Sequence, residues 1–526
     1  MMFHQSKRSS LASVSVIDRF EFGNTREDAV RALLENSFPY SKKLSGHSSC
    51  VNALAFSTGD GRFLASGGDD MQIQIWDFHQ DNVNVPSCSF RGPRGNIFSL
   101  EFSATNRYLY SGGTDETVLK YDISHFGSYL DATSVRSPLQ TFREHEDTIR
   151  GISCHPYQDE IFLSVSQDGR ILRHDGRTSL RRLRSQDSIQ VAAEVTGIQF
   201  HPIMDNIFVT SDGRGVVCLR DVRMAFGPLR TRTREGIVQV YNTKLAKRGS
   251  DILSNPEASS VTFDRDGTKL AVTMLHHLPT IYALSDPIPI AVCSGKNRPG
   301  GTPVPPSERT YSNGCTIKHG SFGGPGLDCD GFYSAGSEDF CAYVWKIPRL
   351  SELIGRRLEV SPSSWVTDES PSSVGFTNGF RNPRYVPVEL DTPTFRLTGH
   401  KSIVNSTLIH PHFLHILTSG IEKDILLHSP TAISPCSNDM QLTSTDVRAL
   451  SGDDDEDRTI YFRALTGHHE PDSMDNDEDS ETVTVRMFDH ILREEGQVDL
   501  FETRRWSDDS SDDEEGDSLD DITFET

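Results

Sequence analysis

One unit of short β-rich runs recurs along most of this chain, and repetition on this scale constrains the fold more than any other feature. The clearest copy extends from Leu44 to Asp77. It opens on Gly46-His47, closes on Trp76-Asp77, and separates its apolar runs by Gly and Asp turns. One such unit cannot bury its own apolar faces, so several copies are expected to pack against one another.

A step of six residues from an Asp to an aromatic residue or a His identifies further copies. The step recurs at three places, which are Asp115 and Tyr121, Asp168 and His174, and Asp339 and Trp345. A second Gly-His opener ends at His400, and two weaker units lie at 196–221 and 260–282. Together these make seven units, enough to close a ring.

The unit resembles the GH…WD repeat of β-propellers. This resemblance implies an all-β fold, a seven-bladed WD-repeat β-propeller, in which His47, Ser66, Asp70 and Trp76 form a hydrogen-bonded chain within one blade. Equivalent places in other blades are expected for Asp115, Asp168, Asp339, Trp345 and His400. A buried network of this kind specifies one geometry, because each of its polar groups needs a partner.

The repeat and the composition predict three parts of the chain. We expect an N-terminal segment at 1–37, the propeller at 38–430 and a tail at 431–526. Long loops rich in Pro, Gly, Ser or charge are expected at 226–256, 285–311 and 348–394, and loops of this length are either functional or disordered. The stretch Phe38–Leu44 either supplies the outer strand of the last blade, which would close the ring, or is a linker.

The net charge of −23 is concentrated in the tail. Residues 431–526 hold 29 Asp or Glu against 7 Arg, while the rest of the chain is nearly neutral. We therefore expect an acidic, largely disordered tail, with a short helix at about 485–495 that either docks on the ring or binds a partner. Ser507, Ser510 and Ser511 precede acidic residues, an arrangement that suits an acidophilic kinase.

The sequence contains no recognisable catalytic, cofactor-binding or metal-binding motif. It has no P-loop, GxSxG elbow, HExxH or kinase signature, and its nine Cys form no CxxC pair. Neither a signal peptide nor an apolar run of about 18 residues is found. We expect a non-enzymatic protein of the nucleus or cytoplasm that needs no cofactor and enters no membrane. The nearly neutral body argues against direct binding of nucleic acid, which is expected only through a partner.

A short amphipathic helix is expected before the ring, at about 25–36. Thr25-Arg26-Glu27-Asp28 matches a helix-capping pattern, and Val30, Leu33 and Leu34 then form one apolar stripe. The helix either packs on its own propeller or inserts into a groove of a partner.

Two successive units end in His174-Asp175-Gly176-Arg177 and Arg220-Asp221-Val222-Arg223. These endings resemble the WDxR motifs of the WD-repeat substrate receptors of the cullin-4 RING ubiquitin ligase. Similar phrases occur at 44–56, 278–282, 311–345, 397–405, 420–423 and 488–495. The chain departs from the motif where His174 and Arg220 replace a Trp or Tyr, and where Arg214 occupies the usual place of a turn Asp.

The resemblance implies docking on the damaged-DNA-binding adaptor of that ligase and presentation of an unknown protein substrate for ubiquitination. Asp175 and Asp221 would hold the turns that aim Arg177 and Arg223 at the adaptor; alternatively, each Arg only pairs with its neighbouring Asp. The stripe of Val30, Leu33 and Leu34 would belong to a helix inserted into the adaptor.

A different function also fits the sequence, that of a general WD-repeat scaffold or a chromatin-associated reader unconnected to ubiquitin. Such a protein would bind acidic peptide or nucleic acid through a dense basic run. This run comprises Arg170, Arg173, Arg177, Arg181, Arg182 and Arg184, and its alternative interpretation is a solvated loop.

Overall fold

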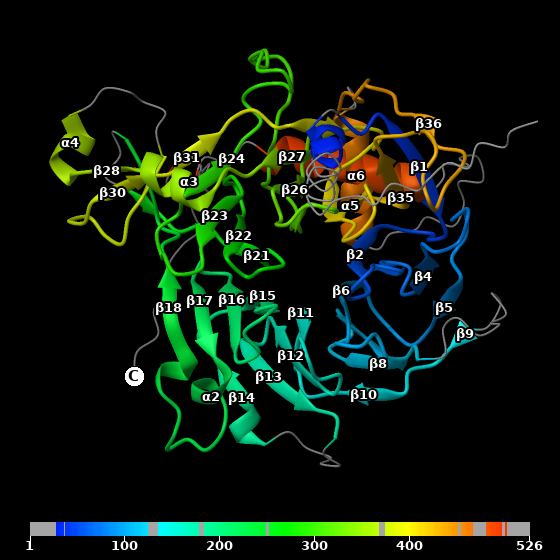
Figure 1. Cartoon of the computed structure of the whole chain (residues 1–526), viewed down its shortest axis with the longest axis horizontal. Coiled ribbons are helices and arrows are strands. Elements are labelled where there is room, and N and C mark those ends of the chain that lie inside the picture. Colours follow the sequence, from blue (N-terminus) through cyan, green and yellow to red (C-terminus); the bar gives the residue numbers. More distant parts are fainter. Residues whose placement is uncertain are drawn as a thin grey trace, which may run out of the picture.

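The computed structural model describes residues 28–450, 454–466, 480–496 and 500–501, except 36, 125–134, 178–183, 249–251 and 368–373. In this described part the strands form eight sheets, of which seven stand around a common axis as the blades of a ring (Figure 1). The expected all-β propeller with seven blades is therefore confirmed.

The first four blades use strands in nearly unbroken chain order. Blade 1 contains β2 (Val51–Phe56), β3 (Phe63–Gly68), β4 (Ile73–Asp77) and β5 (Cys88–Phe90), with β9 (Val135–Arg136) parallel to β5. Blade 2 contains β6 (Ile97–Phe102), β7 (Tyr108–Gly113), β8 (Val118–Asp122) and β10 (Gln140–Phe142). Blade 3 contains β11 (Ile149–Cys154), β12 (Ile161–Ser166), β13 (Arg170–Asp175) and β14 (Ser188–Gln190). Blade 4 contains β15 (Val195–Phe200), β16 (Ile207–Asp212), β17 (Val217–Asp221) and β18 (Ile237–Tyr241).

The last three blades complete the ring. Blade 5 contains β21 (Ala258–Phe263), β22 (Lys269–Met274), β23 (Thr280–Ala283) and β24 (Ala291–Cys293), with β31 (Val388–Leu390) parallel to β24. Blade 6 contains β25 (Ser321–Gly323), β26 (Phe332–Gly336), β27 (Ala342–Lys346) and β32 (Phe395–Leu397). Blade 7 contains β33 (Val404–Ile409), β34 (Ile416–Gly420), β35 (Glu422–Ser429) and β1 (Tyr40–Ser45), with β36 (Gln441–Leu442) outside β1.

The ring is closed by a strand from the start of the described chain. β1 pairs antiparallel with β35, in a register that runs from Tyr40 opposite Ser429 to Ser45 opposite Asp424. Leu44 is fully buried between blades 7 and 1, and Lys43 forms an ion pair of 2.9 Å with Asp424. The prediction that this stretch supplies the outer strand of the last blade is confirmed.

Apolar side chains from neighbouring blades fill the space between them. One such cluster joins Ala65 and Ile73 of blade 1 to Ile97 and Leu100 of blade 2. Gly68, which ends β3 in blade 1, has no room for a side chain, because a Cβ there would collide with the carbonyl oxygen of Cys50. The preceding chain passes that close, so no larger residue fits there.

An eighth sheet stands beside the ring, on the left of Figure 1, and we call it the auxiliary sheet. Its strands, in spatial order, are β20 (Leu253–Ser254), β19 (Leu245–Lys247), β29 (Val374–Phe376), β30 (Arg384–Val386) and β28 (Leu358–Val360). Two helices, α3 (Leu350–Arg356) and α4 (Pro362–Thr367), accompany them. Most of this sheet comes from the segments expected as loops at 226–256 and 348–394, and those segments also supply β18 and β31 to the ring. The expected loop at 285–311 likewise contains β24.

Short helices occupy other connections. α2 (Val222–Ala225) follows β17, and two 3₁₀ turns, η1 (Ser185–Asp187) and η2 (Arg234–Gly236), precede β14 and β18. Residues 28–35 are helical, which agrees with part of the expected helix at 25–36, whose other positions lie outside the described residues. No helix among the described residues combines the length and the apolar character needed to cross a bilayer.

Part of the acidic tail is folded onto the ring. α6 (Ser480–Glu495) is longer than the helix expected at 485–495, and α5 (Asp454–Thr466) was not predicted. Leu492 of α6 is buried with Cys50, Phe340 and Ile403 of the ring. Asp457 of α5 accepts hydrogen bonds from Arg486 and Arg493, each at 2.8 Å, which joins the two helices.

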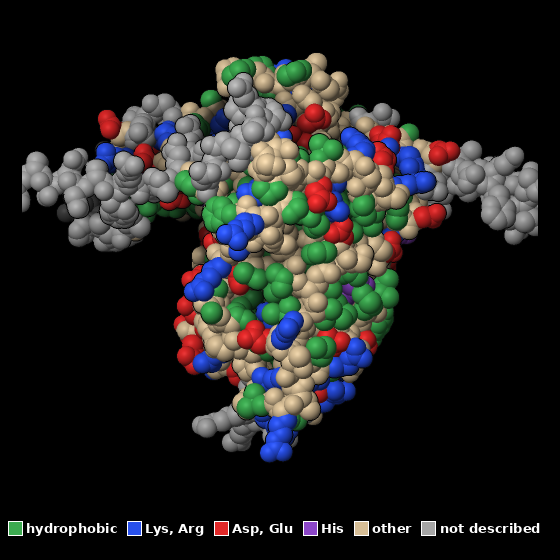
Figure 2. Space-filling model, turned by 90° about the vertical axis from the view of Figure 1, so that its left-hand side faces the viewer, with side chains coloured by type: hydrophobic (Ala, Val, Ile, Leu, Met, Phe, Trp, Pro, Cys, Tyr) green, Lys and Arg blue, Asp and Glu red, His purple; other side chains and the backbone are tan. Residues whose placement is uncertain are grey.

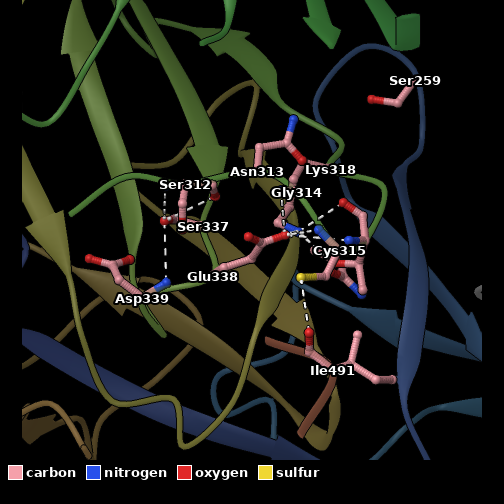
Figure 3. Close-up of polar contacts among 12 residues, drawn as sticks. Ser259, Ser312, Asn313, Gly314, Cys315, Lys318, Ser337, Glu338, Asp339 and Ile491 are labelled. Atoms are coloured by element: carbon pink, nitrogen blue, oxygen red, sulfur yellow. Dashed lines mark hydrogen bonds and ion pairs between the residues drawn. The ribbon is translucent and has the colours of Figure 1, made fainter. Parts of the chain in front are cut away.

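A buried ion pair lies in blade 6 near α6 (Figure 3). Lys318 Nζ and Glu338 Oε1 are 3.3 Å apart, and both side chains are almost completely buried. Glu338 also accepts hydrogen bonds from the backbone N–H groups of Gly314 and Cys315, at 2.7 and 2.6 Å. Burial alone would raise the pKa of Glu338, but Lys318 and these N–H groups outweigh it and lower that pKa.

Candidate docking face of the ring

The first candidate arginine, Arg177, follows the last residue of β13 by two positions. Its Nε donates a hydrogen bond of 2.8 Å to Asp175 Oδ1, and its Nη2 donates one of 2.7 Å to Asp175 Oδ2. This hydrogen-bonded fork lowers the pKa of Asp175. The Arg177 side chain is still 58% exposed, so a second molecule can reach it.

The second candidate arginine, Arg223, repeats this geometry in blade 4. Its Nε and Nη2 donate hydrogen bonds to Asp221 Oδ1 and Oδ2 at 3.1 and 2.7 Å, and its side chain is 70% exposed. Asp221 caps α2 by accepting from the backbone N–H of Arg223, and the Arg223 fork lowers the pKa of the Asp221 carboxyl. Asp175 and Asp221 therefore hold both turns, and both arginines are paired with them.

Both pairs lie on one face of the ring. In an antiparallel blade the connections after the first and third strands emerge on one face, and those after the second and fourth on the other. Arg177 follows the third strand of blade 3, and Arg223 follows the third strand of blade 4. We call this side the docking face. Blade 1 differs, because Asp77 receives its two hydrogen bonds from Arg62, which lies 15 residues earlier.

The N-terminal helix lies on the docking face as well. Glu35 forms an ion pair with Lys346, the last residue of the third strand of blade 6. Leu34 is 3% exposed and packs against Phe332 and Val344, while Val30 packs at the edge of the same cluster. Leu33 is 37% exposed. The helix therefore uses Leu34 and Val30 to pack on its own propeller, and of the three stripe residues only Leu33 is exposed.

The residues predicted for the blade network meet in blade 1. His47 Nδ1 lies 2.9 Å from Asp70 Oδ2, and His47 Nε2 lies 2.8 Å from Ser66 Oγ. Trp76 Nε1 donates to the same Ser66 Oγ at 3.0 Å. All four side chains are therefore joined, and the chain of contacts links β3 and β4 with the turn between them and with the opening turn of the blade.

Blade 3 contains the same network with a His in place of the Trp. His145 contacts Asp168 at 2.9 Å and Ser164 at 2.8 Å, and His174 Nε2 lies 2.8 Å from the same Ser164 hydroxyl. His174 replaces the Trp or Tyr of the motif, but it still contacts the hydroxyl of Ser164. His145 was missed, although it precedes Asp168 by 23 residues, as His47 precedes Asp70.

Blade 7 changes three of the four network residues. His400 lies 2.7 Å from Glu422 and 2.7 Å from Thr418, and His428 lies 2.9 Å from Thr418. Blade 4 retains one contact, in which Arg220 Nε donates to Thr210 Oγ1 at 3.0 Å. Arg220 and His428, each on the third strand of its blade, lie ten positions after the threonine that they contact.

The other predicted network residues have different partners. Asp115 accepts from the backbone N–H groups of Arg94 and Thr117 at 2.9 and 3.2 Å. Asp339 accepts from the Tyr343 hydroxyl at 2.6 Å, and Trp345 Nε1 donates to the Ser294 carbonyl at 2.8 Å. Asp115 and Asp339 therefore stabilise turns near their own strands, whereas Trp345 bonds to the chain that follows β24 of blade 5, and none of these contacts involves a His.

The buried His174 gives the protein an expected pH dependence. Burial lowers the pKa of His174 from 6.5 to about 3, so the unfolded chain takes up this proton first as the pH falls. The contribution of the neutral His174 to the free energy of unfolding is fully present above pH 6.5. Below pH 6.5 it decreases, by up to about 1.4 kcal/mol per pH unit for one such His. We expect His174→Trp to keep the contact with Ser164 and to remove this part of the slope.

The check is urea denaturation of the wild type and of His174→Trp at several pH values. Between pH 6.5 and 5 the variant should lose about 2 kcal/mol less stability than the wild type. Equal losses in the two proteins would contradict the assignment of a neutral, buried His174.

The opposite face carries the mouth of the central channel. A cavity of about 330 Å³ opens there, between residues of several blades that include Phe98, Arg150 and Thr196. Phe488 of α6 forms part of its wall. Within the described ranges, no group of three or more His, Cys, Asp or Glu side chains is arranged to hold a metal ion.

Comparisons with known proteins agree with this geometry. The family model described as "WD domain, G-beta repeat" matches residues 38–77, 84–122 and 136–175, which contain β1 and the first three strands of each of blades 1 to 3. The ring is a WD-repeat β-propeller.

Curated relatives match a longer part of the chain. The chain is 32% identical over 403 residues to DDB1- and CUL4-associated factor 5 of Mus musculus and of Homo sapiens. The alignment covers 76% of this chain and 35% of each relative, so the chain spans about a third of their length. A shorter match, 37% identical over 139 residues, links it to WD repeat protein iqw1 of Schizosaccharomyces pombe and covers 26% of this chain and 17% of that protein.

Proposed function

We propose that this WD-repeat propeller is a substrate receptor of a cullin-4 RING ubiquitin ligase and binds the DDB1-type adaptor through its docking face. The observation that carries the proposal is the 32% identity, over 76% of the chain, to a protein named for its association with DDB1 and CUL4. The arrangement of Arg177 and Arg223 on neighbouring blades supports it.

The contacts of the helix refine the proposed interface. Leu34 and Val30 pack against the propeller itself and fix the helix on blades 6 and 7. Leu33 is then the stripe residue that would contact the adaptor. Arg177 and Arg223 would add their remaining donors, in orientations fixed by Asp175 and Asp221.

In this proposal the protein performs no chemistry of its own and acts in the nucleus or the cytoplasm. It would hold an as yet unidentified substrate close to the ubiquitin-carrying subunit, which raises the local concentration of the substrate. The face with the channel mouth is opposite the docking face and would remain accessible to substrate.

The basic run offers less support for a nucleic-acid reader. Arg170 pairs with Glu146 at 2.7 Å, Arg173 lies 3.7 Å from Asp187, and Arg177 pairs with Asp175. These acidic partners offset the positive charge that phosphate groups would need. Arg181 and Arg182 lie outside the described residues.

Capture by the purified adaptor tests the proposed function. The full chain is expected to bind immobilised adaptor with a Kd below about 1 µM, as measured by biolayer interferometry. Cullin-4 with its RING subunit should join the complex only when the adaptor is present. Absence of binding to the adaptor at micromolar concentrations would refute the proposal.

A further inference from the structure

The auxiliary sheet is a basic region in an acidic protein. The sheet strands with their connections, at 244–257 and 349–386, contain eight Lys or Arg and six Asp or Glu, a small positive excess, whereas the whole chain has a net charge of −23. Lys244, Arg349, Arg356 and Arg381 among them are exposed. Figure 2 views the molecule from the side on which this sheet lies, and both Lys or Arg and Asp or Glu side chains are visible on that face.

The chain returns to this sheet after α6. Leu500 and Phe501 pack against a cluster that includes Leu245 and Phe376 of the auxiliary sheet. The ammonium group of Lys247 lies 5.6 Å from the centre of the Phe501 ring, within the range of a cation–π contact. Phe501 therefore fixes the start of the following segment beside β19 and β29.

A strongly acidic segment follows this attachment point. Residues 507–515 contain six Asp or Glu, three Ser and no Lys or Arg. Asp508 lies seven positions after Phe501, which allows an extended reach of about 25 Å. The segment can therefore reach the sheet that holds Phe501, and its charge is opposite to that of the sheet.

We propose that residues 507–515 bind the auxiliary sheet of their own chain through ion pairs with its exposed Lys and Arg side chains. Single surface ion pairs are weak, but a short tether gives the segment a local concentration in the millimolar range, at which several weak pairs act together. Phosphate on Ser507, Ser510 or Ser511 would add negative charge and strengthen the contact. The bound segment would then exclude other acidic peptides from this sheet.

Zero-length cross-linking of the full chain tests the contact. A carbodiimide joins a Lys amine to a carboxylate only when the two groups touch, and the described part of the sheet offers Lys244 and Lys247. At low salt, cross-links from these two lysines to Asp508–Glu515 are expected, at least about fivefold more abundant than those from Lys296 or Lys401. Sodium chloride at about 0.5 M should abolish the difference.

Two charge variants provide the controls. Arg349→Glu/Arg356→Glu/Arg381→Glu should reduce the cross-links at least about fivefold by removing the attraction. Arg91→Glu/Arg94→Glu/Arg107→Glu makes the same change in net charge at exposed positions of blade 2 and should leave them unchanged. Equal loss in both variants, or cross-links spread evenly over all lysines, would overturn the proposal. Cross-links between differently isotope-labelled copies would overturn it too, since the contact would then be intermolecular. None of these outcomes depends on adaptor binding.

Discussion

Arg177→Glu/Arg223→Glu is expected to weaken binding to the adaptor at least about 100-fold. Each substitution removes a guanidinium that is more than half exposed and places a carboxylate beside Asp175 or Asp221. The loss of a charge-assisted contact together with the new repulsion costs about 1.5 kcal/mol or more per site, and the two costs add to a factor of about 100 or more in Kd. Binding of the purified variant to immobilised adaptor measures the effect.

Blade 1 offers a matched control for this variant. Arg62 forms the same kind of fork with Asp77, at 3.1 and 2.9 Å, and lies on the same face of the ring. Arg62→Glu therefore disrupts an equivalent pair outside the two near-WDxR units and should leave the affinity for the adaptor unchanged. If it weakens binding as much as the double variant does, the effect belongs to the charge of the face, not to Arg177 and Arg223. An unchanged Kd in the double variant would show that both arginines have only their local structural role.

Charge reversal should leave the fold intact. In both pairs the arginine side chain is more than half exposed, and each aspartate keeps a hydrogen bond from a backbone N–H, so loss of the ion pair should cost little stability. Arg177→Ala/Arg223→Ala removes the donors without adding repulsion, so a smaller loss of affinity, of about tenfold, is expected. The thermal unfolding of all variants should remain close to that of the wild type.

The number of blades could be predicted because each blade repeats a short local pattern. The six-residue step from Asp168 to His174 lies within one hairpin, where sequence spacing and strand register correspond directly. The network in blade 1 was expected from the resemblance to WD repeats, and the structure contains its contacts. His145 and Glu422 were missed because the interpretation required a Gly-His opener or an Asp, whereas the geometry requires only a polar partner about 22 or 23 residues from the His.

The auxiliary sheet could not be predicted because its pairing is not local. β19 pairs with β29, so Leu245 lies opposite Phe376, more than a hundred residues later. Each strand of this sheet has two or three residues, too few for a periodic pattern to emerge. The content of Pro, Gly, Ser and charged residues therefore led to the prediction of loops at 226–256 and 348–394. For the same reason α5 was assigned to an acidic disordered run, although Asp457 has two arginine partners on α6.

The positions of the candidate residues in the fold could be predicted from the sequence, but their contacts only in part, and their role in binding stays a prediction. The positions of Arg177 and Arg223 follow from the ends of the third strands, which the sequence marks by Asp175 and Asp221. The burial of Leu34 depends on Phe332 and Val344, nearly three hundred residues away, so the stripe could not show which of its members faces outward.

Glu338→Gln is expected to destabilise the protein by about 3–5 kcal/mol. It would leave the fully buried Lys318 without its counter-charge, and the cost of an unpaired buried charge exceeds what the intact pair contributes. The carboxylate also accepts from the N–H groups of Gly314 and Cys315, and an amide can satisfy these two donors only with its oxygen. Equilibrium urea denaturation followed by circular dichroism measures the effect.

A double-mutant cycle separates the charge from the hydrogen bonds. Lys318→Met/Glu338→Gln removes the ammonium group and keeps an oxygen acceptor for Gly314 and Cys315, so we expect it to be more stable than Glu338→Gln alone by about 2 kcal/mol. The pKa of Glu338 lies below its ordinary value, so its contribution is complete at neutral pH and is lost only as the pH falls through that lowered value. Glu352→Gln provides the surface control, since Glu352 pairs with Arg356 through exposed side chains and should cost less than about 1 kcal/mol. If Glu338→Gln costs as little as this control, the buried pair does not contribute to stability as proposed here.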